Sequence, residues 1–230
     1  MRPLLSAFLS FLVAAASAGC GQAQPPAPQA QAPSAPQAAP SPAASGVQIE
    51  TDQTATVKII LEAENGKIEA PMAVFTDATP PPGVNGPKGA SGGKYAETPE
   101  PVDVDPETGK RKENIGGSTA LNFTAPQTGD YYIWLRVWWR HKCANSFEAG
   151  LDGMPGLKPG SKPHQITDNT VESWRWLAVG PNVFQPAPIR LEKGEHTLKI
   201  TTREDGSVLD QALVVNDPDY VPSGIEKPAP

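Results

Sequence analysis

An all-β domain is the fold class that the sequence predicts, and three observations lead to it. Several short runs alternate apolar and polar residues with a period of two, which is the pattern of half-buried strands. Gly, Pro, Asn or Asp bound these runs, and those residues favour turns. No convincing stretch carries apolar residues at helical spacing. About seven short antiparallel strands in a chain of this length predict a two-sheet β-sandwich.

The clearest alternation lies in "GDYYIWLRVWWR", residues 129–140. Because successive side chains of a strand point to opposite faces, one face should enter the core, with Tyr131, Ile133, Leu135, Val137 and Trp139. The opposite face carries Tyr132, Trp134, Arg136, Trp138 and Arg140. Further strands are expected over 57–63, 119–123, 146–151, 174–179, 196–202 and 209–215. The Gly- and Pro-rich stretch 80–117 is expected to be an irregular excursion.

Residues 1–48 are predicted to precede the domain. Residues 1–20 have the pattern of a secretory signal peptide, because one Arg precedes an apolar run that is too short to span a bilayer. Residues 21–48 are rich in Pro, Ala and Gln and carry no charge, a composition that cannot build a core and predicts a disordered linker. The sandwich is expected over 49–219 and a short tail over 220–230.

Two cleavage sites remain open for the signal peptide. Ala16-Ser17-Ala18 is an A-x-A site, whereas Ser17 to Cys20 resembles a bacterial lipobox. We favour lipidation of Cys20, which would leave Cys143, the other of the two cysteines, unpaired. Cys143 is expected to be a small buried thiol. The protein is therefore predicted to be exported, as a membrane-anchored lipoprotein facing the periplasm or the cell surface, or otherwise secreted.

Two carboxylates lie close together near the start of the predicted domain. In "LEAENGKI", Glu62 and Glu64 alternate on one strand face, and they would repel each other unless a cation lay between them. Calcium accepts several oxygen ligands, including carboxylates, and Asp210 in "SVLDQALVVND" could supply a third. A pair of solvated strand carboxylates is the alternative interpretation.

Five stretches in this order resemble the galactose-binding-like jelly-roll modules of carbohydrate-binding families six and thirty-five: "LEAENG", "ASGGKY", "GDYYIWLRV", "LEKGEHTLKI" and "REDGSVLDQALVVND". The resemblance covers most of residues 57–217. It implies a jelly-roll β-sandwich, a non-catalytic carbohydrate-binding function and a structural calcium ion held by Glu62, Glu64 and Asp210.

A sugar site needs a flat aromatic surface and nearby planar polar groups, and "RVWWRHKCANSF" offers both. We expect ligand-binding residues at the rim of the sandwich: Trp138, Arg140, His141, Asn145, Trp174, Trp176 and Arg203. Trp139 lies on the strand face that is expected to enter the core, so it should pack inside. One of Trp174 and Trp176 could equally be a core residue.

The sequence favours a binding module over an enzyme. The three histidines occur without a metalloprotease motif or a nucleophile elbow, and nothing selects a pair of catalytic carboxylates. The formal net charge of −6 excludes a broad basic surface for nucleic acid. The predicted partner is a polysaccharide or glycan, with a separate carbohydrate-active enzyme as a compatible second partner. The alternatives are an envelope protein-interaction or assembly module and, third, a small polysaccharide-active enzyme.

Overall fold

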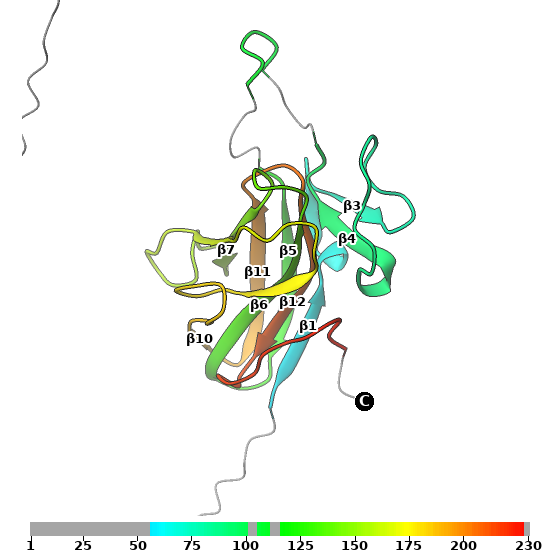
Figure 1. The fold of residues 1–230 in the computed structure, drawn as a ribbon. Helices are drawn as coiled ribbons and strands as arrows, with labels where there is room; N and C mark the ends of the chain where they lie inside the picture. Colours follow the sequence, from blue (N-terminus) through cyan, green and yellow to red (C-terminus); the bar gives the residue numbers. More distant parts are fainter. Residues whose placement is uncertain (1–55, 101–104, 111–115, 228–230) are drawn as a thin grey trace, which may run out of the picture. The chain divides into compact units, whose positions relative to one another are not determined.

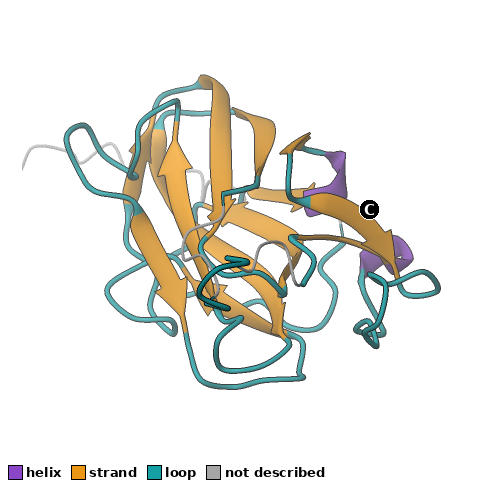
Figure 2. Cartoon of the chain, turned by 90° about the horizontal axis from the view of Figure 1, so that it is seen from above, coloured by secondary structure: helices purple, strands orange, loops and turns teal. Residues whose placement is uncertain are grey.

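Two antiparallel β-sheets face each other in the computed structural model, which describes residues 56–100, 105–110 and 116–227 (Figure 1). The strands are β1 (Lys58–Glu62), β2 (Lys67–Glu69), β3 (Ala73–Thr76), β4 (Lys94–Glu97), β5 (Ser118–Ala125), β6 (Gly129–Trp139), β7 (Ser146–Leu151), β8 (His164–Thr167), β9 (Arg175–Ala178), β10 (Ile189–Leu191), β11 (Gly194–Thr202) and β12 (Ser207–Val215). Helical residues form only the short turns η1 (Ala63–Asn65) and η2 (Ser91–Gly93) in the described part (Figure 2). The predicted all-β sandwich is confirmed.

The two sheets differ in size. Sheet A has the order β10-β6-β12-β4-β3, with β9 also beside β6 and β1 also beside β12. Sheet B has the order β2-β5-β11-β7-β8. Strands that are distant in the sequence therefore lie next to each other, as β1 and β12 do along five paired residues.

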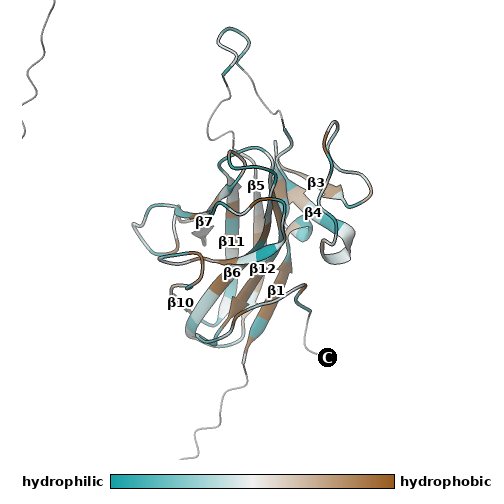
Figure 3. Cartoon of the chain, viewed as in Figure 1, coloured by the Kyte–Doolittle hydropathy of each residue, from teal (hydrophilic) through white to brown (hydrophobic). Residues whose placement is uncertain are grey.

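The core lies between the two sheets and takes the face of β6 that the alternation predicts. Tyr131, Ile133, Leu135, Val137 and Trp139 are all fully buried. They pack in one cluster with β11 and β7 residues such as Leu198, Ile200 and Phe147. Figure 3 shows apolar residues concentrated on the strands, whereas the loops are largely polar.

A β-bulge interrupts the pairing of β12 with β6 between Leu209 and Gln211. Leu209 and Ala212 both enter the main core, although a regular strand would place residues three apart on opposite faces. The extra residue in the bulge therefore puts Asp210 and Gln211 on the outer side of sheet A, one after the other.

All seven predicted strands are present, and residues 146–151 have the predicted bounds. Five strands of three or four residues escaped prediction: β2, β3, β4, β8 and β10. The expectation of an irregular excursion over 80–117 is wrong in part, because β4 lies inside it and pairs with both β3 and β12. Runs of three or four residues are too short for alternation to be recognised.

The expectation that Cys143 is buried is wrong, since its thiol is free and exposed. The chain turns after β6, with the Ala144 amide donating to the His141 carbonyl at 3.0 Å. This turn directs Ala144 inward and leaves Cys143 outside. The signal peptide, Cys20 and the linker lie outside the described residues. Within the part that is described, no helix is long and apolar enough to cross a membrane.

His196 should make stability depend on pH. Burial lowers the pKa of His196, but the Glu192 carbonyl and the Asp152 carboxylate raise it more, so that the net shift is upward. Because the folded-state pKa exceeds the unfolded value, this stabilisation is complete below the unfolded pKa and is lost as the pH rises through the folded pKa. We expect His196→Gln to cost about 1 kcal/mol near pH 5.5 and less near pH 8. Urea unfolding at both pH values measures this, and equal costs would contradict it.

Candidate functional site

The outer face of sheet A carries most of the aromatic residues expected to bind a ligand, and neighbouring segments partly cover it. One cluster joins Trp138 and Trp174 to Ala90, Tyr95 and Val208. A second joins Trp176 to Trp134 and Tyr220. The structure therefore brings Trp138 and Trp174 together, whereas Trp176 belongs to a different cluster.

Trp138 and Arg140 contact each other. The Arg140 guanidinium lies 5.5 Å from the centre of the Trp138 ring. It also donates two hydrogen bonds to the buried Glu97 carboxylate, from Nε to Oε1 at 2.6 Å and from Nη2 to Oε2 at 2.9 Å. Burial raises the pKa of Glu97, although Arg140 opposes that shift. Arg140 is thus held in a bidentate ion pair below a half-buried Trp138.

Trp174 has a similar arrangement with Arg136. The Arg136 guanidinium lies 4.6 Å from the Trp174 ring centre and is paired with the buried Asp210. The Trp174 indole donates to the Lys88 carbonyl at 2.8 Å. Burial raises the pKa of Asp210 to about 6, although Arg136 lowers it. Each tryptophan therefore lies against a cation that is already paired, and the segment before η2 also holds Trp174.

His141, Asn145 and Arg203 lie where β6 ends and where β11 turns towards β12. His141 Nε2 is 2.6 Å from Glu100 Oε1. The Asn145 side chain is buried and donates to the Asp168 carbonyl at 2.7 Å. Arg203 donates to the Ser146 hydroxyl at 3.3 Å and lies 3.5 Å from Glu148 Oε1. Asn145 and Arg203 support loops here, and His141 is the most exposed of the three.

The three carboxylates expected to hold calcium gather around η2. The Ser91 hydroxyl donates to Glu62 Oε1 at 2.9 Å, and the Ser91 amide donates to Asp210 Oδ1 at 2.8 Å. Burial raises the pKa of Glu64, and the charges of Glu62 and Asp210 raise it further. The acidic residues are thus close enough to feel one another's charge.

Only part of this acidic cluster fits a bound cation. Oε2 of Glu62 and Oε2 of Glu64 are buried without a hydrogen-bond partner, whereas both Asp210 oxygens are already engaged by Ser91 and Arg136. Among the residues that the structure describes, no group of three or more His, Cys, Asp or Glu side chains could hold a metal together. Any cation would have to rest on Glu62 and Glu64 with other oxygen donors.

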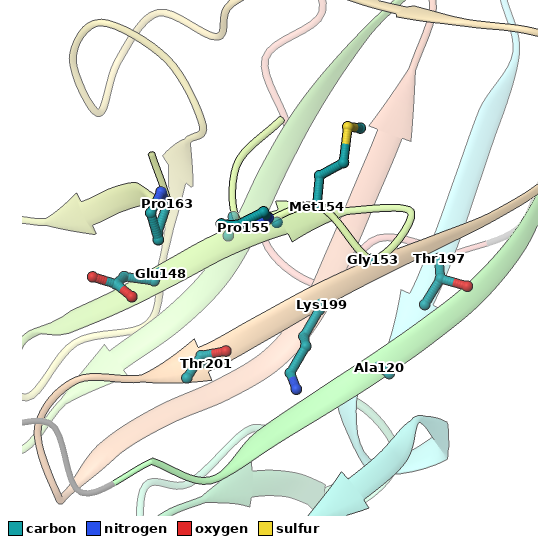
Figure 4. A pocket seen from close by; sticks show the side chains of 11 residues that line it. Ala120, Glu148, Gly153, Met154, Pro155, Pro163, Thr197, Lys199 and Thr201 are labelled. Carbon is teal, nitrogen blue, oxygen red and sulfur yellow. The ribbon is translucent and has the colours of Figure 1, made fainter. Parts of the chain in front are cut away.

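A groove that sequence reasoning missed lies on the outer face of sheet B, with a volume of about 290 Å³ (Figure 4). Its floor comes from β5, β11 and β7, with Lys199 and Thr201 on β11 and Glu148 on β7. Met154 and Pro155 form one wall, because their carbonyls lie close over Gly150. The alternation of β11 indicates which residues face outward, but nothing in the sequence indicates that residues 153–155 fold back over Gly150.

Comparison with known proteins finds neither a matching family model nor a matching curated protein. Among solved structures, a family 35 carbohydrate-binding module from Clostridium thermocellum matches with a TM-score of 0.47 and 15% identity over 69% of this chain and 97% of its own. A GH26-CBM35 β-(1,4)-mannanase from Podospora anserina has a TM-score of 0.47 and 13% identity over 74% of this chain. This chain spans 30% of that mannanase.

A third match is the C-terminal CBM6 of a marine laminarinase from Zobellia galactanivorans, with a TM-score of 0.42 and 14% identity over 69% of this chain and 98% of that one. Families 35 and 6 are the two that the sequence resembles.

Proposed function

We propose that this protein is a non-catalytic carbohydrate-binding module and that a glycan lies in the groove on sheet B. The amphipathic lining of the groove is the observation that carries the proposal. A sugar ring presents hydroxyl groups at its edge and C–H groups on its faces, so a site needs both polar and apolar walls. Lys199, Thr201 and Glu148 supply hydrogen-bonding groups, while Pro155 and Pro163 supply apolar contacts.

Lys199 is a groove residue whose replacement should leave the fold intact. Lys199 pairs with Glu69 at 2.9 Å, and the two side chains are 47% and 49% exposed, so their ion pair contributes little to stability. Lys199→Ala should therefore weaken glycan binding about tenfold, through loss of a hydrogen bond from a charged group, with an unchanged melting temperature. Affinity electrophoresis against plant, algal and bacterial polysaccharides measures this, with product size monitored.

The matched control is Lys193→Ala, which removes an exposed lysine from the turn before β11. If Lys193→Ala and Lys199→Ala weaken binding equally, the effect is one of net charge and the groove is not the site. If no polysaccharide retards the folded protein, the proposed function itself fails. If a polysaccharide binds but the groove is not the site, the second candidate surface is the set of rim residues expected from the sequence, and His141→Ala tests its exposed part in the same assay: Trp138, Arg140, His141, Asn145, Trp174, Trp176 and Arg203.

We also propose that calcium stabilises the fold through Glu62 and Glu64, with the negative charge of Asp210 nearby. The support is the pair of buried carboxylate oxygens without partners, which are ligands of the type that calcium prefers. Calcium at about 100 times its dissociation constant would stabilise the folded state by about 2.7 kcal/mol. That corresponds to a rise in melting temperature of roughly 5–10 °C for a domain of this size.

Thermal unfolding with calcium and with excess chelator tests this proposal. The double variant Glu62→Gln/Glu64→Gln should lose the response to calcium, whereas Glu69→Gln on β2 should retain it. An identical melting temperature in calcium and chelator would remove the metal from the proposal.

A protein-interaction function is the second candidate, and one observation favours it. Phe184, in the loop between β9 and β10, is 81% exposed. Two hydrogen bonds brace the loop: the Ala178 amide donates to the Val183 carbonyl at 2.8 Å, and the Phe184 amide donates to Asn182 Oδ1 at 3.0 Å. A rigid, exposed aromatic residue can anchor a protein interface. If the protein binds isolated cell envelopes, this function is favoured when free sugars do not compete with the binding and Phe184→Ala abolishes it.

The predicted signal peptide and the predicted lipid anchor at Cys20 support a location on the cell envelope. The module would be displayed on the envelope through the linker 21–48. Metabolic labelling with a fatty acid, lost in Cys20→Ser, tests the anchor.

A further inference from the structure

The chain returns across the outer face of sheet A after β12. We call residues 217–227 the C-terminal strap (Figure 1, red). Tyr220 packs on an aromatic cluster with Trp134, Trp176 and Tyr132. Glu226 is only 7% exposed. The described part of the strap contains no β-strand, so it is held by side chains of the sheet rather than by a ladder of main-chain bonds.

Two of these side chains bind main-chain atoms of the strap. The Trp176 indole donates to the Gly224 carbonyl at 3.0 Å. The Gln211 side-chain amide donates to the Glu226 carbonyl at 3.0 Å and accepts from the Glu226 amide at 3.1 Å. Main-chain recognition of this kind does not depend on the bound sequence, so another extended peptide could make the same contacts.

Two further contacts select the side chains of the strap. Lys58 forms an ion pair with Glu226 and lies 4.9 Å from the centre of the Tyr220 ring. The Tyr220 hydroxyl donates to the Glu226 carboxylate at 2.9 Å and accepts from Lys58 Nζ at 2.7 Å. The face therefore prefers a peptide in which an aromatic residue precedes an acidic residue.

The strap leaves one donor of this aromatic cluster unused. The Trp134 indole N–H is buried, and the residue is 4% exposed, yet this N–H has no hydrogen-bond partner within the described residues. Buried donors are rarely left unpaired, because the lost hydration is not replaced. The strap is thus an imperfect occupant, and a peptide that offered one more acceptor would be held more firmly.

We propose that the outer face of sheet A is a peptide-binding groove, formed by Lys58, Trp134, Trp176 and Gln211 and occupied in cis by the C-terminal strap. Its ligand in trans is an extended, proline-containing peptide with an aromatic and an acidic residue spaced as Tyr220 and Glu226 are. The groove lies on the opposite sheet from the proposed glycan site and does not depend on it.

The test uses the full chain and a fluorescein-labelled synthetic peptide of residues 216–230. The double variant Tyr220→Ala/Glu226→Ala removes the strap's side-chain contacts. It should bind the peptide at least about tenfold more tightly than the unaltered protein, because the cis strap no longer competes. The control variant Asp219→Ala changes an exposed residue of the strap and should behave like the unaltered protein.

Two further arms fix the site and the specificity. Trp176→Phe, added to the double variant, keeps an aromatic ring but removes the indole donor, and it should weaken peptide binding at least about fivefold. A peptide that carries the same two alanine substitutions should not bind. The proposal is overturned if the folded double variant does not bind the peptide up to about 1 mM. It is equally overturned if the double variant loses its near-ultraviolet circular dichroism, because the strap is then an integral part of the fold.

Discussion

Replacement of Glu97 by alanine should lower the free energy of unfolding by about 3–5 kcal/mol. Glu97 is fully buried, and its carboxylate accepts two hydrogen bonds from Arg140. Without it, the Arg140 guanidinium stays buried with no carboxylate partner, although it still donates to the Asn85 carbonyl at 2.6 Å, and the cost of its lost hydration is no longer offset. The unpaired cation, rather than the lost ion pair, therefore dominates the effect.

Urea unfolding followed by tryptophan fluorescence measures this change. Arg190→Ala is the control, because Arg190 and Asp130 form an ion pair 3.6 Å long whose side chains are 63% and 57% exposed, and it should change stability by less than about 0.5 kcal/mol. The double variant Glu97→Leu/Arg140→Met should recover most of the loss. A cost below about 1 kcal/mol for Glu97→Ala would show that Arg140 can reach water and is available to a ligand.

Trp139→Ala should destabilise the fold by about 3–5 kcal/mol, and Trp138→Ala by distinctly less. Trp139 is fully buried, its ring centre is 5.3 Å from that of Phe147, and its indole donates to Asp168 at 2.6 Å. Trp138 is only half-buried, and its partner Arg140 keeps the Glu97 carboxylate after the substitution. The two neighbours should therefore differ because the strand alternates.

Thermal and urea unfolding of both variants compare the two costs directly. Trp139→Phe separates ring packing from the indole donor, and it should cost about 1–3 kcal/mol, through loss of the indole hydrogen bond to Asp168 Oδ1, which keeps Arg175 as its other donor, and through the smaller ring. Equal costs for Trp138→Ala and Trp139→Ala would mean that the alternation of β6 does not decide burial at its end.

Alternation predicted the long strands because burial on one face imposes it. β6 runs for 11 residues, long enough for five core residues to repeat every second position. The short β4, by contrast, is held by its pairing with β3 and β12. Such a strand is set by its neighbours in space, which a linear sequence does not display.

The candidate site was harder to predict than the fold. The sequence placed Trp138, Trp174 and Arg140 in one predicted site, and the structure brings Trp138 close to the other two. It could not show that Glu97 and Asp210 already hold Arg140 and Arg136 beside these tryptophans. Those carboxylates come from β4 and from a bulge in β12, both outside any local pattern. The groove on sheet B was missed for a related reason, since the loop that walls it is positioned by the glycine at 150, whose missing side chain leaves room for two carbonyls.

The bulge in β12 joins two parts of the molecule that are far apart in sequence. It presents Asp210 and Gln211 on the same side, so that one residue holds Arg136 while the next hydrogen-bonds both Glu62 and the strap at Glu226. Removal of a single residue here would restore regular pairing but would turn one of these side chains into the core. The chain can therefore vary in the identity of its residues at this point far more easily than in their number, because an insertion or deletion would disturb the Arg136 ion pair and the strap contact together.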